Sequence, residues 1–288
     1  MTNKFRVACV QTNSTREVAE NVATVGAMIA RAAAEGANLI CTPENVALIE
    51  PKRDLRLQKA DREENHAALA AFREAAAKAG TWVLAGSLAV RVDAERIANR
   101  SYLIDASGAI VASYDKIHMF DVDLPNGESY RESAGVKPGD RAVLADTPWG
   151  PIGLTVCYDL RFPHLYRALA QAGAMYLAIP SAFTRPTGQA HWHVLQRARA
   201  IETGCYVFAP AQCGVHAENR KTYGHSLIVA PWGEVLADGG DEPGVIMAEI
   251  DPAKVLEARR MVPSLQHDRP FAAPALHPQR AAIRAAGE

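Results

Sequence analysis

The sequence of 288 residues has almost no net charge, because 31 lysines and arginines face 32 aspartates and glutamates. A balanced charge produces no strong field toward nucleic acid or an anionic membrane. No run of 18 consecutive apolar residues is present, and the amino terminus lacks the uninterrupted apolar stretch of a secretory signal. We therefore expect no nucleic-acid partner and no membrane partner.

Cysteine is also scarce, and its pattern excludes a common type of metal site. The five cysteines are an odd number, and no two of them form a CxxC pair of the kind that zinc and redox sites use. The sequence therefore predicts no metal, no cofactor and a reducing, cytoplasmic setting. The cysteines are Cys9, Cys41, Cys157, Cys205 and Cys213.

Short apolar runs alternate with amphipathic stretches along both halves of the chain. Strands are predicted at 5–11, 37–44, 81–90, 100–106, 109–116, 152–160, 174–183 and 205–213, and helices at 21–36, 64–80, 162–173 and 190–204. Ser107-Gly108 predicts one antiparallel hairpin, and residues 226–239 predict another. We expect an α/β protein with mixed sheets and, because no linker divides the halves, a single domain over 1–270.

Two segments follow neither the helical nor the strand period. Residues 118–141 hold prolines, glycines and many charges, and a loop of this length in a compact domain is usually functional, so we expect an active-site loop. Periodicity is also missing after Pro263. We expect residues 271–288 to form a tail that either frays or packs on a partner subunit.

Three residues with complementary chemistry stand at the ends of predicted strands. Cys157 precedes a helix-opening turn, where helix amides favour a thiolate and can bind an oxyanion, so an exposed, acidic nucleophile is expected there. Glu44 offers a base, and Lys116 offers a cation. Each has an ordinary alternative as a buried structural thiol, a capping or surface carboxylate, or a solvated lysine. Only the combination favours catalysis.

The segments around these residues resemble the three signatures of the nitrilase superfamily of carbon-nitrogen hydrolases. They are Pro43-Glu44-Asn45, Tyr114-Asp115-Lys116-Ile117-His118 and Cys157-Tyr158-Asp159-Leu160-Arg161-Phe162-Pro163. Their order and spacing agree with the family, and the similarity extends over about residues 5–270. The resemblance implies a four-layer αββα sandwich that dimerises through its helices.

The resemblance also implies roles for individual residues. Cys157 would attack an amide carbonyl to give a thioester and release ammonia, with Glu44 as general base and Lys116 as oxyanion stabiliser. The Tyr158 backbone N–H would be a second oxyanion donor. Many members carry a second glutamate after the lysine, which Glu132 matches best. Glu128 is the alternative, and both could instead be solvated loop charges.

The pattern FDVDLP…ES…PGD before CYDLRFP resembles the branch that contains deaminated glutathione amidase and omega-amidase. The segment 205–226 is more similar to the deaminated glutathione amidase side, so a small linear amide that bears a carboxylate is the expected substrate. Arg161 could pair with that carboxylate, or it could pack at the helix start. Further pocket candidates, which could equally form an ordinary turn, are Phe183, Thr184, Arg185 and Thr187.

Other activities remain open at this point. They are omega-amidase, N-carbamoyl amino acid amidohydrolase, a non-catalytic binding protein on the same fold, and a peroxide-type cysteine enzyme that would need Cys205 or Cys213 as a resolving thiol. The segment His191-Trp192-His193 offers an HxH pair, but without acidic or cysteine partners it indicates packing and not a metal site.

Overall fold

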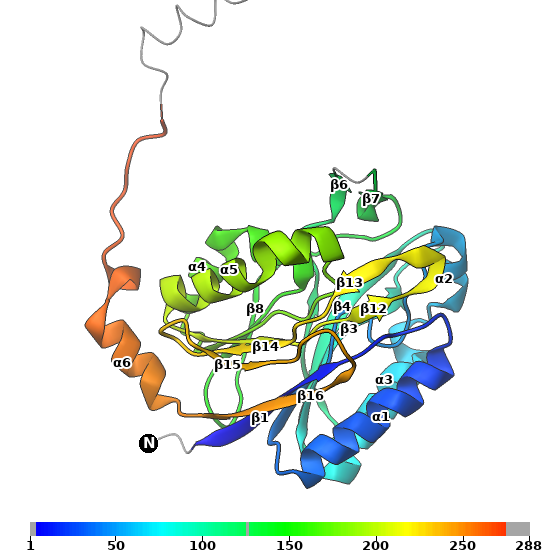
Figure 1. Ribbon diagram of the computed structural model, residues 1–288, viewed down its shortest axis with the longest axis horizontal. Helices are drawn as coiled ribbons and strands as arrows, with labels where there is room; N and C mark the ends of the chain where they lie inside the picture. Colours follow the sequence, from blue (N-terminus) through cyan, green and yellow to red (C-terminus); the bar gives the residue numbers. More distant parts are fainter. Residues whose placement is uncertain (1–3, 125–126, 275–288) are drawn as a thin grey trace, which may run out of the picture.

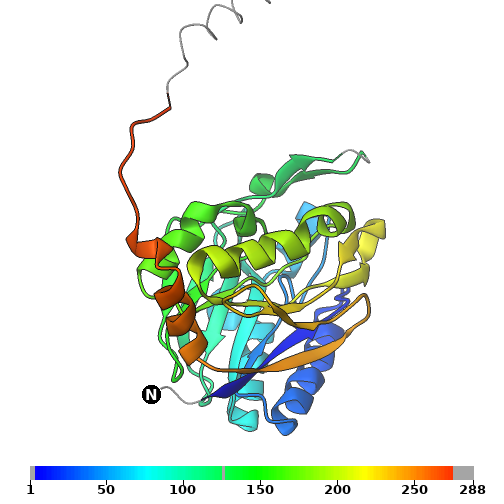
Figure 2. The same cartoon turned by 60° about the vertical axis from the view of Figure 1, so that its left-hand side comes forward.

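Two stacked β-sheets with helices on both outer faces form the protein. The computed structural model describes residues 4–124 and 127–274. Each large sheet has six strands; helices α1 and α3 cover the first sheet, and α4 and α5 cover the second (Figure 1). Figure 2 shows the same layers from the side. The predicted α/β class and four-layer αββα sandwich are therefore confirmed.

The strands occur in two large sheets and two short hairpins. The first sheet, in spatial order, contains β16 Gly244–Ile250, β1 Phe5–Gln11, β2 Leu39–Cys41, β3 Trp82–Arg91, β4 Ile97–Ile104 and β5 Ile110–Asp115. The second contains β15 Val235–Asp238, β14 Leu227–Val229, β11 Tyr206–Ala209, β10 Tyr176–Ala178, β9 Ile152–Leu154 and β8 Val143–Ala145. The short pairs are β6 Asp121–Asp123 with β7 Ser129–Arg131, and β12 Cys213–Val215 with β13 Lys221–Tyr223.

Helices connect the strands and cover the sheets. The α-helices are α1 Val18–Ala34, α2 Arg53–Lys59, α3 Ala67–Ala79, α4 Pro163–Gln171, α5 Arg185–Thr203 and α6 Ala253–Met261. The short 3-10 helices are η1 Glu63–Asn65, η2 Glu132–Ala134, η3 Cys157–Arg161, η4 Ala217–Asn219 and η5 Ser264–Gln266. None of the described helices is long and apolar enough to span a lipid bilayer.

Strand β1 shows how one apolar run supplies two cores. Val7 and Cys9 belong to the apolar cluster that joins the two sheets, whereas Ala8 and Val10 belong to the cluster under α1 and α3. Successive side chains of a strand point to opposite faces, so a strand buried on both sides needs apolar residues at every position. The continuous apolar character of β1 follows from this position between two layers.

The strand directions bring distant residues to one edge of the molecule. Strands β1, β2 and β3 are parallel, and β5 runs in the same direction because two antiparallel pairings separate it from β3. In the second sheet, β9, β10 and β11 are parallel. Residues that follow β2, β5 and β9 therefore leave carboxyl ends of strands, where ligand sites of such sheets commonly lie.

Several elements differ from the predicted ones. Strand β16 was not predicted, yet it pairs with the whole of β1, from Phe5 opposite Ile250 to Gln11 opposite Gly244. Helices α2 and α6 were also not predicted. Helix α5 begins at Arg185 and not at residue 190, because Pro186 occupies the first turn, where a missing N–H costs nothing.

The two segments without a helical or strand period differ in how much regular structure they contain. Within 118–141, the structure shows the β6–β7 hairpin and the η2 helix, so this segment is partly ordered by short elements. The predicted tail lies mostly in 275–288, outside the described residues. Residues 271–274 have no regular structure, and Phe271 is 89% exposed.

Gly86 in β3 supports the segment that leads to Glu44. A Cβ at this position would overlap the Thr42 carbonyl oxygen and lie 2.6 Å from the Pro43 carbonyl oxygen. We expect Gly86→Ala to lower the free energy of unfolding by about 3 kcal/mol, because backbone atoms would have to move. Urea denaturation of the variant and the wild type measures this difference in the free energy of unfolding.

The matched control for this substitution is Gly26→Ala in α1. Within residues 4–124 and 127–274, no atom beyond the neighbouring helix backbone lies within 4 Å of a Cβ built at Gly26. Alanine is favoured over glycine inside a helix by about 1 kcal/mol, so this variant should become slightly more stable. Equal effects of the two variants would contradict the proposed steric role of Gly86.

Candidate active site

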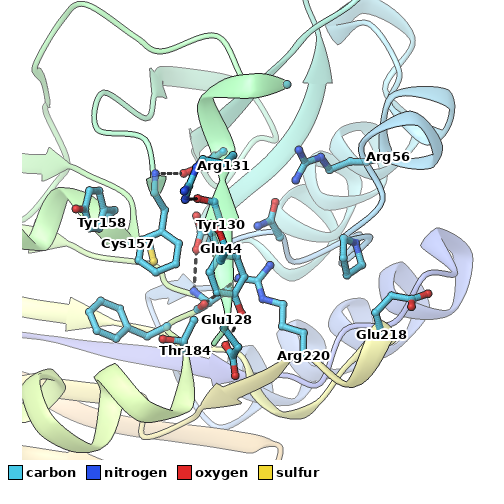
Figure 3. A pocket seen from close by; sticks show the side chains of 18 of the residues that line it. Glu44, Arg56, Glu128, Tyr130, Arg131, Cys157, Tyr158, Thr184, Glu218 and Arg220 are labelled. Atoms are coloured by element: carbon cyan, nitrogen blue, oxygen red, sulfur yellow. Dashed lines mark hydrogen bonds between the residues drawn. The ribbon is translucent and has the colours of Figure 1, made fainter. Parts of the chain in front are cut away.

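A cavity of about 500 Å³ opens at the carboxyl ends of the strands, and its size is typical of a small-molecule site. Glu44, Lys116 and Cys157, which the sequence singled out, all line it. Figure 3 shows Glu44 and Cys157 close together in the cavity. Other lining residues that matter below are Arg53, Arg56, Phe120, Glu128, Tyr130, Arg131, Glu132, Tyr158, Ala182, Phe183, Thr184, Thr187, Glu218 and Arg220. The strand topology thus brings three separate segments to one site.

Glu44 is buried after β2 and is held at both carboxylate oxygens. Oε1 accepts hydrogen bonds from Lys116 Nζ at 3.0 Å and Asn99 Nδ2 at 2.9 Å. Oε2 accepts from the Ala182 backbone N–H at 2.8 Å. A carboxylate with fixed donors on both oxygens is oriented before any ligand arrives, which suits a proton acceptor.

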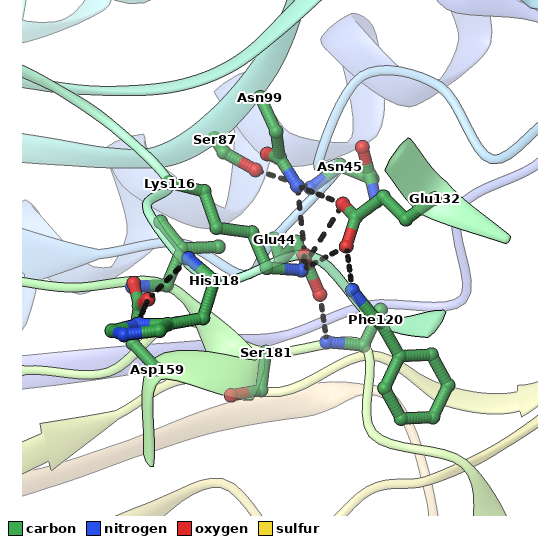
Figure 4. Close-up of polar contacts among 12 residues, drawn as sticks. Glu44, Asn45, Ser87, Asn99, Lys116, His118, Phe120, Glu132, Asp159 and Ser181 are labelled. Carbon is green, nitrogen blue, oxygen red and sulfur yellow. Dashed lines mark hydrogen bonds and ion pairs between the residues drawn. The ribbon is translucent and has the colours of Figure 1, made fainter. Parts of the chain in front are cut away.

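Lys116 lies between two glutamates. Only 2% of its side chain is exposed, and Nζ contacts Glu44 Oε1 at 3.0 Å and Glu132 Oε2 at 2.8 Å (Figure 4). Glu132 Oε2 also accepts from the Phe120 N–H at 2.7 Å. Of the two glutamates considered from the sequence, Glu132 therefore contacts the lysine. Glu128 lines the cavity and accepts a hydrogen bond from Tyr130 Oη.

Cys157 adopts an unusual backbone conformation at the start of η3. Its φ is +51°, in the left-handed region that non-glycine residues rarely occupy, and its N–H donates to the Pro180 carbonyl at 2.9 Å. Such strained residues often occur at functional sites. The conformation turns the chain from β9 into η3 and places the thiol in the cavity beside Glu44 (Figure 3).

The expectation of an exposed, acidic thiol is wrong. Cys157 is only 7% exposed, and burial raises the pKa of its thiol, as does the Glu44 carboxylate. Lys116 and the Ala182 N–H act in the opposite direction but do not compensate. At neutral pH the group is a neutral thiol next to a base, and the helix-terminus argument alone missed the contribution of burial.

The charges of Glu44 and Lys116 support each other. Burial alone would raise the pKa of Glu44, but the Lys116 ammonium and other donors bring that pKa below its usual range. Burial likewise opposes the charge of Lys116, while Glu132 and Glu44 raise the pKa of the lysine. At neutral pH the arrangement therefore holds a carboxylate and an ammonium beside the thiol.

Asp159 is a functional candidate that the sequence analysis did not select. It is fully buried and accepts hydrogen bonds from Tyr114 Oη at 2.7 Å and the Val156 N–H at 2.8 Å. His118 contacts its Oδ1 through both the backbone N–H and Nδ1. Asp159 thus links the turn that carries Cys157 to the segment that carries Lys116. The only sequence signal was its position inside the third motif.

The predicted substrate-binding residues are only partly in the cavity. Phe183, Thr184 and Thr187 line it, as does Tyr158. Arg161 is not among the described lining residues; its guanidinium contacts His191 Nδ1 at 3.3 Å and packs on the Phe183 ring with its Cζ 5.3 Å from the ring centre. This packing at the helix start is the alternative that the sequence left open. Arg185 also lies outside the lining.

The other thiols do not reach this cavity. Cys205 directs its sulfur to the Ala174 carbonyl, and Cys213 lies in the β12–β13 hairpin. Neither lines the cavity with Cys157, and none of the five cysteines is in a disulfide. A resolving thiol for a peroxide-type reaction is therefore missing among the described lining residues.

The two histidines of the HxH segment point to different partners. His191 contacts Arg161, whereas His193 Nε2 lies 2.9 Å from Asp238 Oδ2. His225 Nδ1 lies 2.8 Å from the other oxygen of Asp238. His193, His225 and Asp238 are close enough to hold an ion, but this cluster is on the surface and is not part of the cavity lining.

Comparisons with known proteins agree with this geometry. A family model described as carbon-nitrogen hydrolase matches residues 6–260. Deaminated glutathione amidase from Synechocystis sp. is 40% identical over 272 residues, which cover 91% of this chain and 97% of that protein. Human deaminated glutathione amidase is 42% identical over 271 residues, which cover 92% of this chain and 82% of that protein.

A solved structure also matches the fold closely. The crystal structure of the C. elegans NitFhit protein gives a TM-score of 0.88 at 36% identity. The match covers 93% of this chain and 66% of that chain, so this chain spans about two thirds of that protein. The similarity in sequence and in structure therefore includes both sheets and the cavity between their strand ends.

Proposed function

The chain belongs to the carbon-nitrogen hydrolase family, and on this premise we propose that it is an amidase for deaminated glutathione or a closely related amide. The family acts on carbon-nitrogen bonds other than peptide bonds. The observation that carries the proposal is the buried contact of Lys116 with Glu44 beside the Cys157 thiol in the cavity. The names of the relatives at 40% and 42% identity support the substrate.

In the first half of the proposed reaction, Cys157 forms a thioester. Glu44 accepts the proton of the thiol as Sγ attacks the amide carbonyl carbon. The carbonyl oxygen becomes an oxyanion, which Lys116 Nζ and the Tyr158 backbone N–H stabilise. The carbon-nitrogen bond then breaks, and Glu44 returns the proton to the leaving nitrogen, so an amine departs and the carboxylate is restored.

The second half releases the acid. A water molecule attacks the thioester carbon while Glu44 accepts one of its protons. The same donors stabilise the second oxyanion, the carbon-sulfur bond breaks, and Glu44 gives the proton to the sulfur. Glu44 suits both halves, because the lowered pKa keeps it deprotonated at neutral pH before each attack.

The expected amine depends on the substrate. The resemblance of the sequence to the family implied release of ammonia, which requires an unsubstituted amide. In glutathione, the nitrogen of the γ-glutamyl amide belongs to cysteinylglycine. Hydrolysis of deaminated glutathione at this bond therefore releases cysteinylglycine, and ammonia is expected only from amides such as α-ketoglutaramate.

The test is a substrate panel in which both products are identified by mass spectrometry. It contains deaminated glutathione, α-ketoglutaramate, an N-carbamoyl amino acid and a nitrile. We expect the highest kcat/KM for deaminated glutathione. Preference for α-ketoglutaramate would move the assignment to omega-amidase, preference for the carbamoyl compound to a carbamoylase, and no turnover of any compound would leave a binding protein on the same fold.

We further propose a homodimer in the cytoplasm. Exposed apolar side chains gather where α5, α6 and the β14–β15 turn meet, in a groove lined by Ile201, Trp232 and Val262 among others. An exposed apolar patch of this kind favours a protein partner, and a second copy of the chain is the partner proposed. Five free cysteines support a reducing compartment.

One substitution tests the dimer directly. Leu256 in α6 is 64% exposed in the single chain, so Leu256→Glu should not disturb the fold but should place a charge in the interface. We expect the molar mass from light scattering to change from dimer to monomer. Val111→Glu on β5, at a site 42% exposed, is the control that should stay dimeric. A monomeric wild type would refute the proposal.

A further inference from the structure

Three guanidinium groups on the wall of the cavity lack an acidic partner. Arg53 and Arg56 project from α2, and Arg220 precedes β13; Figure 3 shows Arg56 and Arg220 on the side of the cavity away from Cys157. Within the described residues, no carboxylate lies at ion-pair distance from any of the three. A cavity wall with unpaired positive charge attracts an anionic ligand.

Of the four described glutamates that line the cavity, Glu44, Glu132 and Glu218 pair with other cations, and Glu128 accepts a hydrogen bond from Tyr130 Oη. Lys116 binds both Glu44 and Glu132. Glu218 pairs with Arg16 and with Lys52. Glu44, Glu132 and Glu218 therefore form their ion pairs with other cations. Glu44 and Glu132 act on Arg220 and Arg56 only from beyond ion-pair distance.

Arg220 is held in place by neutral groups. Its Nη2 donates to the Ala182 carbonyl at 3.1 Å, and its guanidinium packs on the Tyr130 ring, with Cζ 5.7 Å from the ring centre. Its Nε is buried and has no hydrogen-bond acceptor among the residues that the structure describes. A buried donor without an acceptor costs free energy that a bound anion would recover. Arg220 is thus fixed in position with donor capacity unused.

Arg220 is connected to the proposed reacting groups through the backbone of Ala182. Ala182 receives the guanidinium at its carbonyl, and its own N–H donates to Glu44 at 2.8 Å. The same N–H acts on the Cys157 thiol. The backbone of one residue, Ala182, therefore contacts Arg220 through its carbonyl and the base and nucleophile through its N–H, which suits an acyl group with a carboxylate only a few bonds from the amide.

Arg56 adds a second charge to the same wall. Burial lowers the pKa of its guanidinium, and the repulsion from Arg220 and Arg53 adds to this effect, while Glu132 and Glu50 oppose it. No side-chain hydrogen bond of Arg56 exists among the described residues. An anion between Arg56 and Arg220 would relieve their repulsion and would accept hydrogen bonds from donors of both side chains that have no acceptor among the described residues.

We propose that Arg220 and Arg56 bind the carboxylate of the acyl part of the substrate and thereby set the specificity for acidic amides. This inference rests on the proposed amidase function and names the residues that recognise its substrate. It replaces Arg161, which the sequence suggested for this role and which contacts His191 instead. Arginine is suited to this task because its planar fork binds both oxygens of a carboxylate.

The first measurement compares two amides of equal chain length. Glutaramate carries a carboxylate where pentanamide carries a methyl group, so the ratio of their kcat/KM values reports carboxylate recognition. We expect Arg220→Gln to lower this ratio about 10- to 100-fold, which is the loss typical of a charged hydrogen-bonded pair. Arg56→Gln should lower the ratio by about 10-fold, and Arg220→Lys should keep part of it.

Two control variants accompany these substitutions. Arg131 lines the same cavity but pairs with Asp123, so Arg131→Gln should leave the ratio unchanged. Arg161→Gln tests the residue suggested by the sequence and should also leave it unchanged. A selective loss of glutaramate activity in Arg161→Gln alone would overturn the inference.

The second measurement does not require turnover. Isothermal titration of 2-oxoglutarate into the Cys157→Ala protein should show binding that Arg220→Gln weakens about 10- to 100-fold. Equal losses on both amides with unchanged 2-oxoglutarate affinity would make Arg220 a structural residue. If the wild type hydrolyses no amide but the titration still depends on Arg220, the amidase proposal fails and the carboxylate site stands.

Discussion

Replacement of Cys157 by alanine is expected to reduce amide hydrolysis by at least about 10⁴-fold. In the proposed reaction every turnover passes through a bond to this sulfur. None of the other four cysteines lines the cavity, so no second thiol can take its place. Glu44 and Lys116 would remain, but activated water alone cannot form the thioester.

The measurement is kcat with deaminated glutathione, together with the melting temperature and the mass of the protein after treatment with iodoacetamide. The wild type should gain one label at Cys157, because it is the one cysteine in the described cavity lining and Glu44 can accept its proton during the attack on iodoacetamide, and the variant should gain none. Cys213→Ala is the matched control, because it removes a buried thiol outside the cavity lining. Activity above about one tenth of the wild-type level in a folded Cys157→Ala protein would refute the nucleophile assignment.

Replacement of Lys116 by methionine should affect both activity and stability. The substitution leaves the carboxylates of Glu44 and Glu132 without their cation in a buried site. Removal of one partner of a buried ion pair typically costs about 3–5 kcal/mol. The proposed oxyanion also loses a donor, which by itself lowers kcat about 100- to 1,000-fold.

The stability effect has a defined dependence on pH. In the wild type, the pKa of Glu44 is below its ordinary value of 4.5, so the ionised group stabilises the fold above that pH and this contribution is lost in acid. Without Lys116, burial would raise the pKa of Glu44 instead, so its ionisation would destabilise the fold as the pH rises. The difference in melting temperature should therefore be largest near neutral pH and smaller below about pH 4.5.

The double variant Lys116→Met/Glu132→Gln provides the control. Glu132→Gln removes one of the two carboxylates that Lys116 neutralises, so the double variant should melt at a higher temperature than Lys116→Met alone. Its activity should stay low, because the oxyanion donor is still missing. A Lys116→Met protein as stable as the wild type at neutral pH would show that the cluster is not charged as described.

Most strands of the two large sheets and the three central residues could be predicted because their signals are local. Buried strands such as β1 and β9 need continuous apolar runs, and the polar residue after each run marks the edge of the sheet. Glu44 and Cys157 follow such runs within a few positions, whereas Lys116 follows β5, a largely exposed strand at the edge of the first sheet. Strand β16 was missed because its place is set by pairing with β1, which lies at the other end of the chain.

The sequence by itself determined the α/β class, the layers implied by its resemblance to a family, and the presence of an acid, a cation and a thiol at strand ends. Only the tertiary structure decided that Glu132 contacts Lys116, that the Cys157 thiol is buried with a raised pKa, and that Arg220 faces the cavity while Arg161 does not. The physical reason is the separation along the chain over which each signal acts. Apolar periodicity acts between neighbours in the chain, whereas burial, charge pairing and cavity lining depend on groups that only folding brings together.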